Sequence, residues 1–85
     1  MEPKKIQQKI EQAIPGARVE VIGENDHYSA VVVSSSFEGK TLVQQHQMVY
    51  AAVREEMANQ IIHALALKTW TPEAADQQGI TFEEK

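Results

Sequence analysis

The residues in this sequence that could both bind a metal and exchange a proton near neutral pH are its three histidines, His27, His46 and His63. The chain of 85 residues has no cysteine. It can therefore supply neither a thiolate nucleophile nor a thiolate ligand to zinc or to an iron–sulfur cluster. A metal bound by this chain would need imidazole or carboxylate ligands, and the use of the histidines depends on the elements that hold them.

The sequence lacks the usual signatures of an enzyme. No serine lies in a nucleophile elbow, and Gly39 stands alone rather than in a glycine-rich phosphate loop. We therefore expect a protein that is not an enzyme. The net charge of −4, with eight basic residues spread along the chain, predicts no concentrated positive surface for nucleic acid. No apolar stretch has the length of a signal peptide or of a membrane span, so we expect a cytoplasmic protein without a membrane partner.

Three segments have the pattern of helices. The first begins near Pro3 and ends at Pro15, with isoleucines on one side. The second begins with a capping box formed by Thr41 and Gln44. The third begins with Thr71 as its N-cap and ends at Gly79. The apolar side of the second helix is predicted to consist of Leu42, Val43, Val49, Tyr50, Ala51, Val53 and Met57.

Three further segments have the pattern of strands, at 17–23, 27–36 and 62–69. The first two are separated by a turn and predict a hairpin, in which the serines at 34–36 form a solvated strand end. The order α-β-β-α-β-α predicts an α+β fold, with helices packed on one face of a three-stranded mixed sheet. We expect a single domain over residues 1–85, with its core at about 3–79 and a flexible tail at 80–85.

This topology would bring two histidines together. His27 begins the second predicted strand, and His63 lies at the start of the third. A helical crossover normally returns the chain parallel to the strand it left, so neighbouring strands would start at the same end of the sheet. The two imidazoles would then be separated by one inter-strand step of about 4.8 Å, or by a few such steps. His46 lies early in the second helix and is expected towards the opposite end. From the residues alone, an ordinary structural role stays open for each histidine.

Four motifs resemble the signature of the BolA family, whose fold is of the class II KH-like type. They are FEGK at 37–40, HQMVY at 46–50, IHAL at 62–65 and TP at 71–72, and the resemblance spans about residues 5–75. It implies that the protein binds a monothiol glutaredoxin of the CGFS type. It also implies work in iron–sulfur cluster trafficking and assembly and in iron or redox regulation.

The resemblance further implies a metal site. His63 matches the histidine of IHAL, which in the family's complexes with a glutaredoxin is a ligand of a bridging 2Fe-2S cluster. The family's second ligand comes from the loop between the first two strands, where His27 is the candidate. The other ligands would come from the glutaredoxin and its glutathione, and the isolated chain would hold no cluster tightly.

Two other functions stay open. The KH-like fold and some members of the family suggest a DNA-binding transcriptional regulator, for which Gly39 and Lys40 are the candidate contacts. A KH domain grips the nucleic-acid backbone with a GxxG loop, whereas FEGKTL has one glycine. The third alternative is a homodimer formed by pairing of sheet edges.

Overall fold

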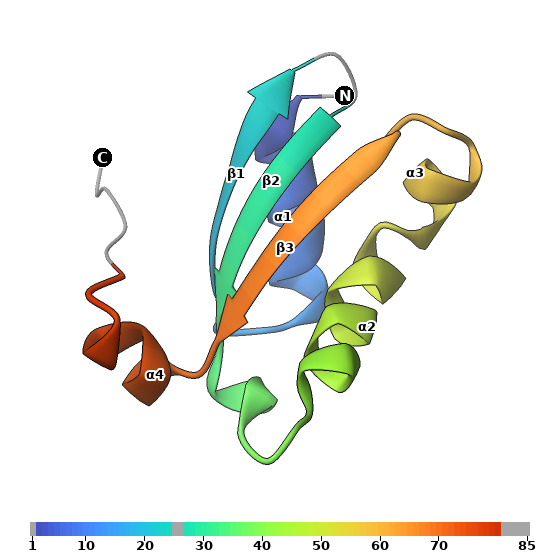
Figure 1. The fold of residues 1–85 in the computed structure, drawn as a ribbon. Coiled ribbons are helices and arrows are strands. Elements are labelled where there is room, and N and C mark those ends of the chain that lie inside the picture. Colours follow the sequence, from blue (N-terminus) through green and yellow to red (C-terminus); the bar gives the residue numbers. More distant parts are fainter. Residues whose placement is uncertain (1, 25–26, 81–85) are drawn as a thin grey trace.

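A computed structural model describes residues 2–24 and 27–80 of the chain. The elements (Figure 1) are α1 (Pro3–Ala13), β1 (Arg18–Glu24), β2 (His27–Val33), the 3-10 helix η1 (Ser35–Phe37), α2 (Leu42–Ala52), α3 (Arg54–Ala58), β3 (Ala64–Trp70) and α4 (Pro72–Gln77). The predicted α+β fold is confirmed. Of the predicted tail, Ile80 is held by a hydrogen bond from its N–H to the carbonyl of Ala75, and 81–85 lie outside the described residues.

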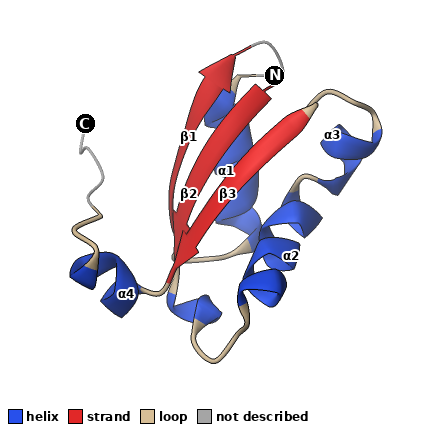
Figure 2. Ribbon diagram, in the orientation of Figure 1, coloured by secondary structure: helices blue, strands red, loops and turns tan. Residues whose placement is uncertain are grey.

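The sheet has the order β1-β2-β3 and is mixed, as the sequence predicts. β1 and β2 are antiparallel, and β2 and β3 are parallel neighbours. Helices α1 and α2 lie on one side of the sheet, and α4 follows the end of β3 (Figure 2). In the described part of the chain, no helix has the length and apolar character needed to cross a membrane.

The hydrophobic core lies between α1 and α2 and the face of the sheet that these helices cover. Alternate residues of each strand point into it, because side chains of a strand alternate between its two faces. Tyr28 of β2 and Leu65 of β3 are both buried. Their burial therefore anchors β2 directly after His27 and β3 two residues after His63. The core cluster consists of Ile6, Ile10, Ile14, Val19, Val21, Tyr28, Ala30, Val32, Phe37, Val49, Val53, Ile62 and Leu65.

The start of α2 confirms the predicted capping box. The Thr41 hydroxyl accepts a hydrogen bond from the Gln44 N–H at 3.2 Å, and the Gln44 side chain accepts one from the Thr41 N–H at 2.9 Å. The prediction was wrong for Leu42, Val43 and Ala51. Leu42 and Val43 are 60% and 65% exposed and lie in the first turn, whereas burial begins at Val49. Ala51 is exposed as well. Helical periodicity gives the direction of a side chain around the axis, but not how far along the axis the core extends.

The second strand is shorter than predicted. It ends at Val33, and Ser34 is buried rather than solvated. The Ser34 hydroxyl accepts a hydrogen bond from the Ser36 N–H at 3.0 Å and so caps η1. A serine hydroxyl can satisfy a free backbone N–H locally, which favours a turn over continued strand. The turn directs Phe37 into the core, where it is 1% exposed.

Candidate functional site

Two of the three histidines meet at one end of the sheet. His27 is the first residue of β2, and it pairs with Ala64, the first residue of β3. His63 immediately precedes Ala64. The two imidazole rings stack, with centroids 6.2 Å apart and planes inclined by 16°. The predicted convergence is therefore confirmed, although β3 starts at Ala64 and His63 lies in the bend before the strand.

The backbone that leads to His63 is closely held. Gln60 has a positive φ of 60°, and the N–H groups of Ile61 and Ile62 both donate to the carbonyl of Glu56, at 2.8 and 3.1 Å. The side chain of Ile62 is 1% exposed. The chain is thus anchored in the core one residue before His63, whose own side chain is exposed.

An ion pair supports the same turn. The ammonium group of Lys9 in α1 lies 2.8 Å from the carboxylate of Glu56 in α3. Hydrogen bonding from Lys9 lowers the pKa of Glu56, and the same hydrogen bond raises the pKa of Lys9. Glu56 therefore joins α1 through its side chain to the loop of His63 through its carbonyl.

Glycine is needed beside His27. Gly23 in β1 has a φ of +145° and pairs with Tyr28. A Cβ at position 23 would lie 2.3 Å from the His27 carbonyl oxygen and 2.7 Å from the Cα of Tyr28. β1 can thus approach β2 this closely at this end of the hairpin only because residue 23 has no side chain. Gly23 shapes the site without contributing a functional group.

His46 and the predicted nucleic-acid contacts lie elsewhere. His46 is half-buried in α2, beside Gln45, which accepts a hydrogen bond from the Thr69 hydroxyl at 2.7 Å near the far end of β3. Its Nε2 atom has no hydrogen-bond partner among the residues that the structure describes. Gly39 and Lys40 are exposed in the turn that precedes α2. The structure therefore does not place these three residues with the histidine pair.

The described part of the chain has no cluster of three or more histidine, aspartate or glutamate side chains suited to a metal ion. The stacked pair consists of two imidazoles. Each iron in a 2Fe-2S cluster has four ligands, including its sulfides, and both irons of the cluster need a full set. A cluster at this pair would need further ligands from another molecule.

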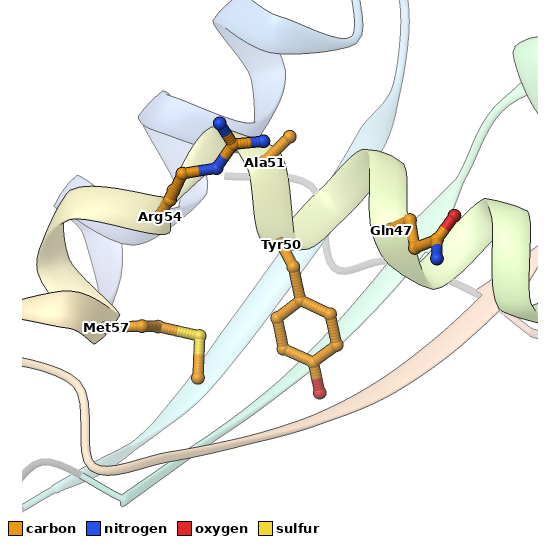
Figure 3. A pocket seen from close by; sticks show the side chains of 5 residues that line it. All are labelled: Gln47, Tyr50, Ala51, Arg54 and Met57. Atoms are coloured by element: carbon orange, nitrogen blue, oxygen red, sulfur yellow. The ribbon is translucent and has the colours of Figure 1, made fainter.

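A shallow hollow of about 650 Å³ opens along α2 and α3 (Figure 3). The Tyr50 ring points from α2 towards β3, and its hydroxyl donates a hydrogen bond to the Leu65 carbonyl at 3.0 Å. This contact reaches β3 two residues after His63. The sequence pattern predicted Tyr50 as an apolar residue of the helix and gave no sign of this bond. The hollow is lined by Gln47, Tyr50, Ala51, Arg54 and Met57.

Comparison with known proteins settles the family. The sequence model of the BolA-like protein family matches residues 6–74. The chain belongs to the BolA-like family. It is 33% identical over 72 residues to the acid stress protein IbaG of Escherichia coli K12, covering 85% of this chain and 86% of IbaG. It is 42% identical over 59 residues to the DNA-binding transcriptional regulator BolA of Haemophilus influenzae, covering 69% of this chain and 56% of that relative.

Solved structures of BolA-like proteins have the same fold. The bolA homologue from Coxiella burnetii matches with a TM-score of 0.80 and 38% identity, over 89% of this chain and 97% of the homologue. BolA1 from Mus musculus matches with a TM-score of 0.77 and 30% identity, over 93% of this chain and 72% of BolA1. The BolA-like architecture expected from the sequence motifs is thus confirmed.

Proposed function

We propose that this BolA-like protein is an adaptor that binds a monothiol glutaredoxin and co-ligates a bridging 2Fe-2S cluster through His63 and His27. It would act in iron–sulfur cluster trafficking and assembly and in iron or redox regulation. The observation that carries the proposal is the stacking of two exposed imidazoles at the start of two parallel strands.

The chemistry of the pair fits such a cluster. Imidazole nitrogen is an established ligand of 2Fe-2S iron, in centres where two histidines replace two cysteines on one iron. Both side chains are exposed, so they can turn towards a shared metal without disturbing the core. Their backbones are held by buried neighbours, Tyr28 after His27 and Ile62 before His63. Reorientation would therefore involve the rings rather than the strands.

The incompleteness of the site favours a shared cluster over a resident one. The chain has no cysteine, and its described residues offer a pair of imidazoles rather than a full ligand set. The thiolates would come from the glutaredoxin and its bound glutathione. Because a protonated imidazole cannot bind metal, ligation by this chain should weaken as the pH becomes acidic.

Reconstitution tests the proposal directly. The protein is mixed with apo glutaredoxin, iron, sulfide and glutathione, and the visible absorption and circular dichroism of the cluster are compared with those of glutaredoxin alone. The wild-type chain should change both spectra, and His63→Ala and His27→Ala should reduce or abolish the change. His46→Ala is the matched histidine control and should behave as wild type. Spectra that His63→Ala leaves unchanged would exclude His63 as a ligand.

A second candidate function is DNA binding, because one relative bears the name DNA-binding transcriptional regulator BolA. Gly39 and Lys40 would be its contacts, in an exposed turn. The net charge of −4 opposes it. Affinity for duplex DNA measured at two salt concentrations tests this function. Phosphate contacts release counterions, so the affinity of a true DNA-binding protein falls steeply as salt rises. Lys40→Ala should weaken true binding and flatten that salt dependence.

A further inference from the structure

In the part of the chain that the structure describes, one edge of β3 faces α2 rather than another strand (Figure 1). β3 is the last strand in the order β1-β2-β3 and pairs with β2 on one side. The Trp70 carbonyl accepts a hydrogen bond from the Ser34 N–H, so Trp70 directs its backbone groups towards β2. Backbone groups alternate in direction along a strand of a parallel ladder. The carbonyls of Leu65, Leu67 and Thr69 therefore point to the outer edge.

Two side-chain hydrogen bonds connect α2 to β3. The Tyr50 hydroxyl donates to the Leu65 carbonyl at 3.0 Å, near the start of the strand. The Thr69 hydroxyl donates to the Gln45 side chain at 2.7 Å, near its end. The first bond is two residues from His63, and the second is six residues away. They provide a natural comparison between the two ends of one helix–strand contact.

We propose that Tyr50 is a positioning residue for His63, and that its hydroxyl secures the start of β3 so that His63 stays beside His27. The inference rests on the proposed function, because the position of His63 matters there for ligation. Before His63 the chain is anchored by Ile62 and the Glu56 carbonyl. After His63 it is held by pairing of Ala64 with His27 and by the bond from Tyr50.

The hydroxyl and the ring of Tyr50 have separable roles. The ring packs against the hydrophobic core and also lines the hollow between α2 and α3. Tyr50→Phe keeps the ring and removes the hydrogen bond alone. The Leu65 carbonyl would then depend on water, and the first residues of β3 should separate from β2 more often. A typical intramolecular hydrogen bond corresponds to a roughly threefold to tenfold change in such an opening equilibrium.

Two variants test the proposal, Tyr50→Phe and the matched control Thr69→Val, which removes the bond at the far end. The first measurement is amide hydrogen exchange of the isolated chain at Ala64 and Ala66, corrected for global stability. Exchange should be about threefold to tenfold faster in Tyr50→Phe and unchanged in Thr69→Val. The second is the concentration of chain that produces half of the spectral change of a glutaredoxin-held cluster. Tyr50→Phe should raise it by a similar factor, and Thr69→Val should not.

The outcomes separate this inference from the function on which it rests. If the wild-type chain changes the cluster spectrum and Tyr50→Phe acts at the same concentration, Tyr50 is not a positioning residue although the proposed function stands. The proposal would also be overturned if Ala64 and Ala66 exchanged at the same rates in Tyr50→Phe as in Thr69→Val. If the wild-type chain leaves the spectrum unchanged, the proposed function itself fails. The proposed role of Tyr50 in ligation then fails as well.

Discussion

Gly23→Ala should open the hairpin end that carries His27. The added Cβ would lie 2.3 Å from the His27 carbonyl oxygen and 2.7 Å from the Tyr28 Cα, both of which are backbone atoms. No side-chain rotation can relieve these contacts, so β1 and β2 must move apart at this point. The φ of +145° adds a conformational cost for alanine. Strained backbone costs about 1 to 3 kcal/mol, and forced separation should bring the total loss of unfolding free energy to about 2 to 4 kcal/mol.

Gly39→Ala is the matched control for this substitution. Gly39 also has a positive φ, of +76°, but a Cβ there would meet nothing within 4 Å. Gly39→Ala should lower the free energy of unfolding by about 1 to 2 kcal/mol, from backbone conformation alone. In a domain of this size 1 kcal/mol corresponds to a Tm change of about 4 to 8 °C. Gly23→Ala should therefore lower Tm by roughly 8 to 32 °C, and Gly39→Ala by roughly 4 to 16 °C.

The assay combines thermal and urea unfolding with NMR of the histidine rings. Gly23→Ala should also weaken or remove the contacts between the rings of His27 and His63, whereas Gly39→Ala should preserve them. If the two variants lose equal stability and keep the same ring contacts, the close approach of Gly23 to β2 does not shape the site.

Two further predictions concern the turn that leads to His63. Glu56→Gln should remove part of the acid sensitivity of folding: because Lys9 lowers the pKa of Glu56, the stabilisation is present above the ordinary glutamate pKa and is lost as the pH falls through the lowered value. Urea unfolding from neutral to acid pH should therefore show that the unfolding free energies of the variant and the wild type converge at low pH. A difference in unfolding free energy that stays constant with pH would contradict a stabilising role for this ion pair. Gln60→Gly should stabilise the protein by about 0.5 to 1 kcal/mol, because glycine readily adopts the positive φ found there. A lower Tm in this variant would show that the Gln60 side chain contributes more than its backbone strain costs.

Features set by neighbouring residues in the chain were predictable from the sequence. The capping box of Thr41 and Gln44 is formed as expected, and the Thr71 hydroxyl accepts from the Ala74 N–H at the start of α4. The meeting of His27 and His63 also followed from the sequence, because a helical crossover between adjacent strands requires them to be parallel.

Features that depend on contacts between distant segments were not predictable. The bond from Tyr50 to Leu65 requires knowledge of which strand edge faces α2. The close approach at Gly23 depends on the position of the neighbouring strand. The interruption of the long helix at Val53, with φ −121° and ψ 23°, has no proline or glycine to mark it. Likewise, nothing local distinguishes a bend at His63 from a continued strand.

The most direct measurement of the central claim is pulsed electron paramagnetic resonance of the reduced shared cluster. The chain carries ¹⁵N-labelled histidine, and the glutaredoxin and glutathione are unlabelled, so any ¹⁵N coupling must come from this chain. We predict strong couplings from both His63 and His27, loss of one signal in His27→Ala and of the other in His63→Ala, and no change in His46→Ala. A cluster that forms in the complex but has no ¹⁵N coupling would show that the histidine pair is not a ligand.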